Sequence, residues 1–110
     1  MDQETLIWYM KIFHPGEAKP AASKELEAIF GIRGAALRRS INAMRRQGVP
    51  IASGENGYYY AETELEVRRT IAHLKHRISG ISAAIRGLEK CLPEFDTAQT
   101  RLPLEGGEAL

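Results

Sequence analysis

A dense cluster of turn-forming residues, Ser-Gly-Glu-Asn-Gly at positions 53–57, lies near the middle of the chain and constrains its fold. The segments on both sides of it, residues 49–52 and 58–61, favour β-strands. Turn residues between two such segments are typical of a β-hairpin. Pro50 has no backbone N–H, so it restricts the first strand to a sheet edge or a strand start. The sequence therefore predicts one hairpin.

Three helices are predicted before this hairpin, and the first lies near the start of the chain. Its apolar residues follow helical spacing, and it ends by His14, which is followed by proline and glycine. A short polar link then leads to the second helix. The apolar residues of the first helix are Leu6, Ile7, Trp8, Tyr9, Met10 and Phe13.

The second and third helices flank a turn at residues 31–33. Ser23 is the expected N-cap of the second helix, and Gly31 ends that helix. The apolar residues of the third helix repeat at i, i+4 and i+7, so they are expected to face the core, and Gly48 ends the helix. The apolar stripes are Leu26, Ile29 and Phe30 in the second helix and Leu37, Ile41 and Met44 in the third.

The last predicted helix runs from about residue 63 to residue 90. Thr63 is its expected N-cap, and Glu66 stands three residues later, as in a capping box. The apolar positions are alternately four and three residues apart, which is a heptad pattern, and Pro93 ends the helix. These apolar positions are Val67, Ile71, Leu74, Ile78, Ile81, Ile85 and Leu88.

This heptad pattern predicts a homodimer. A helix of about 27 residues is roughly 40 Å long, which is longer than the small core before it. One end of the apolar face would then be exposed in a monomer. The alternative is that the helix folds back onto the first helix of the same chain. The expected dimer-interface residues are Ile71, Leu74, Ile78, Ile81, Ile85 and Leu88.

The order of predicted elements is helix, helix, turn, helix, hairpin, helix. This order is that of a winged helix-turn-helix, in which the hairpin is the wing. The expected fold class is mainly α with a small β-hairpin wing and a long C-terminal helix. Residues 1–62 form the predicted winged helix-turn-helix domain and residues 63–92 the predicted dimerisation helix. Residues 93–110, rich in Pro, Gly, Thr and acidic residues, are expected to be mostly disordered.

The third helix combines arginines with an outward-facing asparagine. The net charge is +1, but five arginines and no acidic residue lie between positions 33 and 46. A basic patch attracts a polyanion, although a solvated helix face would have the same composition. Arginine is suited to guanine and phosphate, and asparagine to adenine. At about 100° per residue, the expected DNA-binding residues are Arg33, Ala35, Arg38, Arg39, Asn42, Arg45 and Arg46.

Residues 30–51, FGIRGAALRRSINAMRRQGVPI, resemble the recognition region of biotin-operon-repressor-like and DeoR-like winged helices. The core Arg-Arg-x-Ile-Asn-x-Met-Arg is followed by Gly-Val-Pro-Ile, and Gly-Tyr-Tyr-Tyr at 57–60 is similar to the family's second wing strand. The resemblance covers residues 23–61. It implies a winged-helix fold, binding of duplex DNA and no catalysis by this module. The chain is also similar to stand-alone winged-helix proteins of prophages and bacterial replication regions.

Three features depart from the family pattern. Glu27 stands where such motifs usually have a small residue, and Gly34 stands where a polar or basic residue is usual. The wing tip, residues 54–57, is acidic rather than basic. These departures put in doubt the crossing of the two helices, one DNA contact after the turn, and wing contacts to phosphate.

The expected function is sequence-specific binding of double-stranded DNA, as a transcriptional regulator or as a phage or replication accessory protein. The alternative is a protein-interaction adaptor that uses the winged helix and the C-terminal helix. Residues 99–104, QTRLPL, are similar to short peptides that dock on the bacterial sliding clamp. A linker without a partner is the other interpretation of those residues.

The sequence argues against several other functions. It shows no paired carboxylates, nucleophile–base pair or glycine-rich phosphate loop, so no enzymatic activity and no cofactor are expected. His73 and His76 lack further ligands for a metal. Cys91 is the only cysteine, and the acidic start lacks the basic region of a secretory signal. No apolar run approaches the roughly 20 residues of a membrane span. A cytoplasmic location is expected.

Overall fold

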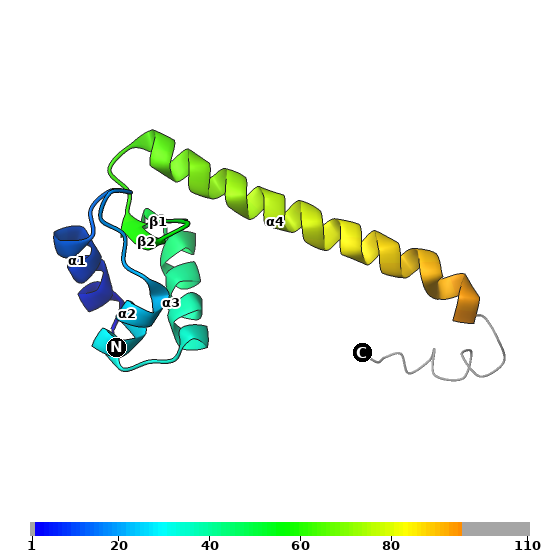
Figure 1. Ribbon diagram of the computed structural model, residues 1–110, viewed down its shortest axis with the longest axis horizontal. Helices are drawn as coiled ribbons and strands as arrows, with labels where there is room; N and C mark the ends of the chain where they lie inside the picture. Colours follow the sequence, from blue (N-terminus) through cyan, green and yellow to red (C-terminus); the bar gives the residue numbers. More distant parts are fainter. Residues whose placement is uncertain (1, 96–110) are drawn as a thin grey trace. The chain divides into compact units, whose positions relative to one another are not determined.

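The computed structural model describes residues 2–95, and the chain divides after His73 into two compact units. We call them the N-terminal unit and the C-terminal unit. The predicted fold class, mainly α with a small β-hairpin wing and a long C-terminal helix, is confirmed (Figure 1). The elements are α1 (Gln3–Phe13), α2 (Ser23–Phe30), α3 (Gly34–Arg46), β1 (Ile51–Gly54), β2 (Gly57–Tyr60), α4 (Glu64–Cys91) and the 3-10 helix η1 (Leu92–Phe95).

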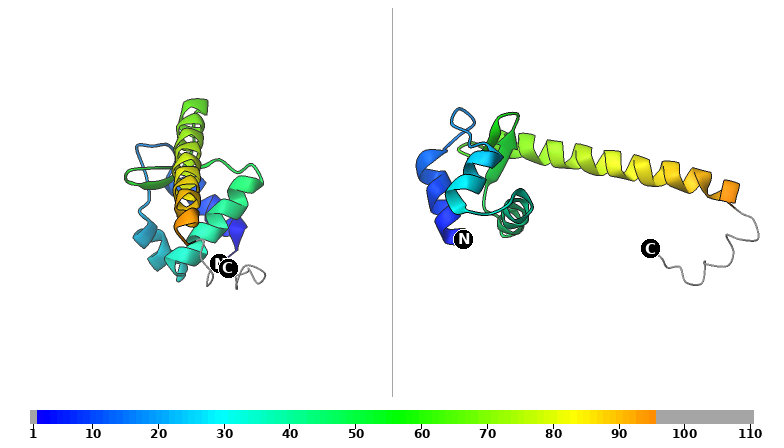
Figure 2. Two further views of the ribbon diagram at one scale, coloured as in Figure 1. Left: turned by 90° about the vertical axis from the view of Figure 1, so that its right-hand side faces the viewer. Right: turned by 60° about the horizontal axis from the view of Figure 1, so that its bottom comes forward.

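One apolar cluster holds the first three helices and the hairpin together. In Figure 2, α1, α2 and α3 gather around the two strands. The stripe of α3 predicted to face the core, Leu37, Ile41 and Met44, is buried, which confirms that prediction. The other buried members of the cluster are Leu6, Met10, Ala21, Leu26 and Ile51.

The start of α1 is fixed by a side-chain cap. The Asp2 carboxylate accepts a hydrogen bond from the Thr5 backbone N–H at 3.1 Å, and this bond lowers the pKa of Asp2. The helix ends at Phe13, as the following His14-Pro15-Gly16 predicted. The buried Leu6 and Met10 are four residues apart and therefore lie on one face of α1, the face that meets the core.

Two predictions about α2 are wrong. The N-cap is Ala22, in an extended conformation and with no side-chain hydrogen bond, and Ser23 is the first helical residue. The Ser23 hydroxyl instead donates to the Glu27 carboxylate at 2.9 Å. Ile29 is exposed, because this helix of eight residues reaches the core through Leu26 and, in part, Phe30. Gly31 ends the helix as predicted, in the left-handed conformation that favours glycine.

The predicted hairpin is confirmed, with Ile51 opposite Tyr60 and Gly54 opposite Gly57. β2 has a second neighbour that the sequence did not indicate, the link between α1 and α2. Tyr58 exchanges two backbone hydrogen bonds with Ala21, at 2.7 and 2.8 Å, and forms an antiparallel bridge with it. The "polar link" therefore extends the sheet on the outer side of β2.

The first turns of α4 belong to the N-terminal unit, and polar contacts join them to the rest of that unit. Thr63 caps the helix as predicted, because its hydroxyl accepts from the Glu66 backbone N–H at 3.2 Å. The Glu66 carboxylate accepts from the backbone N–H groups of Glu62 (2.7 Å) and Glu17 (3.0 Å), and these bonds lower its pKa. The buried Thr70 hydroxyl accepts from the Ser53 N–H of the wing.

The C-terminal unit contains the rest of α4 and η1. Pro93, predicted to start a disordered tail, lies in η1 together with Glu94 and Phe95. The clamp-like peptide at residues 99–104 lies outside the described residues. Within residues 2–95, no helix combines the length and the apolar character needed to cross a membrane.

Candidate nucleic-acid interface

The outward face of α3 carries the predicted DNA-binding side chains. Leu37, Ile41 and Met44 fix the rotation of the helix by pointing into the core. The residues on the opposite side are therefore exposed, as the helical spacing predicted. These exposed residues are Ala35, Arg38, Arg39, Asn42 and Arg46, with Arg33 exposed at the N-cap of the helix.

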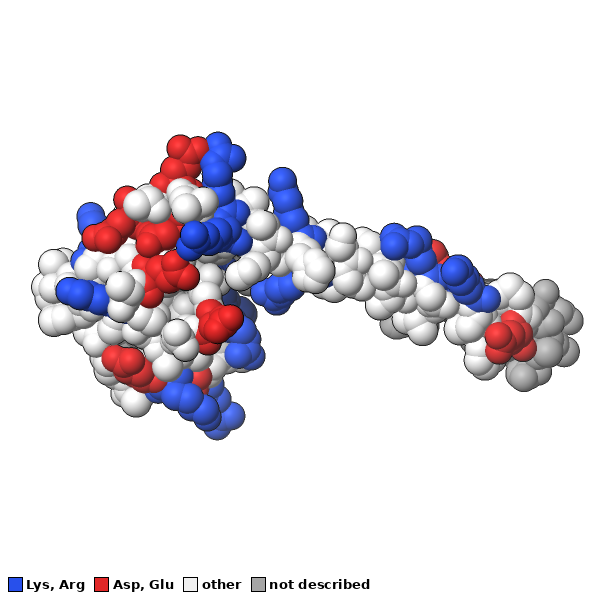
Figure 3. Space-filling view, turned by 45° about the horizontal axis from the view of Figure 1, so that its top comes forward, with Lys and Arg blue, Asp and Glu red and all other residues white. Residues whose placement is uncertain are grey.

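This face carries four exposed arginines, and α3 has no acidic residue of its own. Among residues 2–95, no ion pair within 4.0 Å involves Arg33, Arg38, Arg39 or Arg46. In Figure 3, acidic side chains lie over the middle of the N-terminal unit, and basic ones extend along its lower right edge, on the side of α3. The four guanidinium groups are thus available to an anionic partner.

Arg45, one of the predicted DNA-binding residues, is only partly exposed and is bonded to the hairpin. Its Nε donates to the Ile51 carbonyl at 2.7 Å and its Nη2 donates to the Ser53 hydroxyl at 3.2 Å. The guanidinium also lies 6.0 Å from the centre of the Tyr58 ring. Arg45 therefore joins the end of α3 to both strands of the hairpin.

Replacing Arg45 with alanine is expected to lower the free energy of unfolding by about 1–3 kcal/mol, because the half-buried Ile51 carbonyl contact is lost. Arg46→Ala is the matched control, since it removes the same charge from the neighbouring exposed position. That change should leave stability within about 0.5 kcal/mol. Urea unfolding followed by circular dichroism measures both variants, and equal midpoints would show that Arg45 has no structural role.

Glu27 and Gly34, which both depart from the family pattern, lie next to each other in the structure. A Cβ atom at Gly34 would lie 3.1 Å from a Glu27 carboxylate oxygen and 3.3 Å from Nη1 of Arg38. Gly34 is the first residue of α3, where the helix dipole favours a negative charge. The glycine leaves room for this carboxylate, which makes the N-terminal end of the basic face less positive than the rest.

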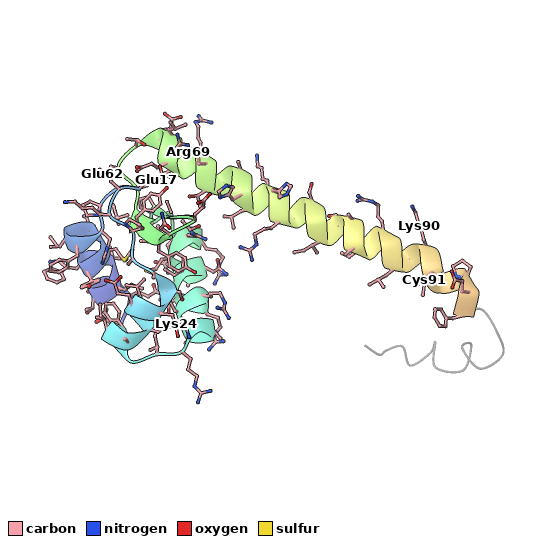
Figure 4. The ribbon with its side chains drawn as sticks, in the orientation of Figure 1. Glu17, Lys24, Glu62, Arg69, Lys90 and Cys91 are labelled. Atoms are coloured by element: carbon pink, nitrogen blue, oxygen red, sulfur yellow. The ribbon has the colours of Figure 1, made fainter. Side chains whose placement is uncertain are left out.

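A polar cavity of about 320 Å³ lies beside the wing. Glu17 and Arg69 point toward each other there (Figure 4) and form an ion pair at 2.9 Å. Burial, and secondly the Glu17 charge, raise the pKa of the Tyr59 hydroxyl, which also lines the cavity. Over residues 2–95, no group of three or more His, Cys, Asp or Glu side chains is placed to hold a metal ion.

The predicted dimer-interface residues stay on one face of α4. Ile71, Ile78, Ile81, Ile85 and Leu88 are exposed, and Leu74 is half-buried. Val67, the first member of the heptad pattern, packs instead against the buried Ala52, Tyr59 and Ala61.

No protein-family model matches the chain, and no curated protein or solved structure matches it. The resemblance to biotin-operon-repressor-like and DeoR-like winged helices therefore stays a prediction.

Proposed function

We propose that this chain is a non-enzymatic protein that binds double-stranded DNA through the outward face of α3. The observation that carries the proposal is that Arg39, Asn42 and Arg46 are exposed on the side of α3 away from its buried stripe, with the exposed Arg38 at one edge and Arg33 at the N-cap. The major groove of B-DNA is about 12 Å wide and admits an α-helix. Within the groove, arginine bonds guanine in a bidentate manner, and asparagine bonds adenine in the same way.

The residues divide into two groups by their position on α3. Arg39 and Asn42 are three residues apart on the side directly away from the core, so they are assigned to base edges. Arg33 and Arg46 lie at the two ends of α3 and Arg38 lies at one edge of the face, so these three are assigned to phosphates. Ala35 has a small side chain that permits close approach to the bases. The proposal includes a cytoplasmic location and a role in transcription or replication.

A protein-interaction adaptor is the second candidate, because the surface of α1 carries exposed apolar side chains. Trp8, Ile12 and Phe13 are each more than half exposed, and the Trp8 and Phe13 rings pack edge to face at 6.2 Å. Exposed aromatic groups of this kind are typical of binding surfaces. The two functions are separated by the salt dependence of duplex binding, which an adaptor does not require.

We expect the chain to bind a duplex of random sequence with an affinity that falls steeply with salt. Three to five phosphate contacts predict a loss of about 50-fold to 500-fold between 50 and 200 mM salt, as counterions are released. Fluorescence anisotropy of a labelled duplex measures this slope. Absence of binding at the lower salt concentration would rule out the proposed function.

The control for this titration is a charge-matched change outside α3. Arg68 lies on α4 and donates to the Glu64 carboxylate at 2.6 Å, so its charge is already compensated. Arg68→Ala should leave the salt slope almost unchanged, whereas Arg46→Ala should reduce its magnitude by about 1. Equal effects of the two changes would mean that binding depends on net charge and not on α3.

A further inference from the structure

The apolar face of α4 from Ile71 onward is largely exposed in the part of the chain that the structure describes. Ile78, Ile81 and Leu88 are 62%, 60% and 68% exposed. We call the apolar stripe of α4 the seam; it consists of Ile71, Leu74, Ile78, Ile81, Ile85 and Leu88. Of its members in the C-terminal unit, Leu74 is half-buried and the others are exposed. A stripe of large apolar side chains at this spacing is not expected to remain in contact with water.

The sequence of α4 also indicates that the helix depends on packing for its stability. Gly80 and Gly87 lie inside the helix, and nothing stands within 4 Å of the position of an added Cβ atom at either residue. Glycine weakens a helix relative to alanine, and most helical stability in proteins comes from packing of an apolar face. A helix with two such glycines and an uncovered face therefore requires a partner surface.

The pattern of the apolar residues identifies that partner as a second copy of the same helix. In heptad notation the a positions are Ile71, Ile78 and Ile85, and the d positions are Leu74, Ile81 and Leu88. β-branched residues at a with mainly leucine at d favour parallel, two-stranded coiled coils. We propose that two copies of this chain pair in parallel through these six residues of α4.

The apolar pattern continues beyond the residues predicted from the sequence. Leu92 and Phe95 follow Leu88 at steps of four and three, and both are more than half exposed. Although η1 replaces the α-helix at this point, the two side chains extend the apolar stripe to the end of the described residues. Six partly or largely exposed side chains from each helix would bury an area on the order of 1,000 Å², which is about the lower limit for a biological interface.

The charges beside the seam are compatible with the parallel arrangement. In a parallel pair, each g position faces the e position five residues later on the other helix. Arg77 then faces Ser82 of the partner subunit, and Ala84 faces Glu89 of the partner subunit, so no like charges are opposed. An antiparallel pair would place Arg68 beside Glu89 of the partner subunit, but Arg68 is already bonded to Glu64 of its own helix.

The first test compares two aspartate substitutions by size exclusion coupled to light scattering at tens of micromolar. The wild type should have twice the 12.3 kDa mass of the chain. Ile78→Asp should give the monomer mass, because it introduces a charge into the middle of the seam. Ala83→Asp, on the opposite exposed face of the same helix, should remain a dimer.

A wild-type monomer at these concentrations would overturn the proposal. The seam would then be a binding surface for a different protein. A trimer or tetramer would overturn the two-stranded arrangement. If Ile78→Asp loses helical circular dichroism, the wild-type mass and the next measurement still decide the proposal. Neither measurement involves DNA, so failure of the dimer and failure of the proposed function are distinguishable.

The second test uses Cys91, the single cysteine, which lies in the last turn of α4 (Figure 4). In a parallel pair, the two Cys91 side chains are at the same height, with helix axes roughly 8–10 Å apart. In an antiparallel pair with the seam fully overlapped, they are more than about 20 Å apart. A bismaleimide with a reach of about 15 Å should therefore link the wild type into a covalent dimer. Cys91→Ser should not be linked, and a wild-type dimer that is not linked would contradict the parallel arrangement.

Discussion

Gly57→Ala is expected to destabilise the N-terminal unit by about 2–4 kcal/mol. Gly57 begins β2 with φ at +132°, a conformation that residues with a side chain rarely adopt. An added Cβ atom would lie 2.1 Å from the Ala21 carbonyl oxygen and 2.6 Å from its carbon. Both are backbone atoms, so no side-chain rotation relieves the clash. The pairing of Tyr58 with Ala21 would have to open.

Gly54→Ala is the matched control for this change, because Gly54 is paired with Gly57 across the turn. The nearest atom to a Cβ at Gly54 is a ring carbon of Tyr59 at 3.9 Å, an ordinary contact. The control should alter the free energy of unfolding by less than about 1 kcal/mol. Denaturant unfolding followed by circular dichroism compares the two variants. If both have the wild-type midpoint, the hairpin does not depend on the link between α1 and α2.

Arg39→Ala and Asn42→Ala are each expected to cost about 1–3 kcal/mol of binding on the preferred duplex, which is a loss of about 5-fold to 150-fold. Both side chains are exposed and lie away from the buried stripe of α3, so neither change removes a core contact. A base contact is lost only where the correct base is present. Binding to an unrelated duplex should therefore change less than binding to the preferred one.

Anisotropy titrations with the preferred and an unrelated duplex measure this difference, with Arg68→Ala as the charge-matched control. Arg38→Ala offers a comparison on α3 itself, because a lost phosphate contact weakens all duplexes alike. If Arg39→Ala and Asn42→Ala behave like Arg38→Ala, the assignment of base-reading residues on α3 is wrong.

The spacing of apolar residues along the sequence was sufficient to predict the elements that position the candidate site. A stripe at i, i+4 and i+7 fixes which side of a helix is buried, so Leu37, Ile41 and Met44 also determined where Arg39 and Asn42 point. The local sequence also indicates where the hairpin lies, but the turn is shorter than the five turn-forming residues 53–57 suggest. Ser53 and Gly54 belong to β1 and Gly57 to β2, which leaves Glu55-Asn56 as the turn.

Contacts between distant segments were not predictable in the same way. In the sequence, Arg45 cannot be distinguished from the neighbouring Arg46. Its structural role depends on the position of the Ile51 carbonyl, which accepts a hydrogen bond from it. The sequence indicates only a polar link between α1 and α2, because its pairing with β2 involves backbone atoms that leave no side-chain pattern. Pro20 and the small Ala21 before α2 were the one available indication of an extended segment.

The base-reading assignment is tested most directly by selecting bound duplexes from a random pool, with the wild type and with Arg39→Ala. Arg39 and Asn42 are about 4.5 Å apart along the axis of α3, which is close to the spacing of neighbouring base pairs. We predict an enriched site with a guanine and an adenine one or two base pairs apart, and loss of the guanine preference in the variant. A pool that shows no enrichment, or a variant that selects the same guanine as the wild type, would contradict the account.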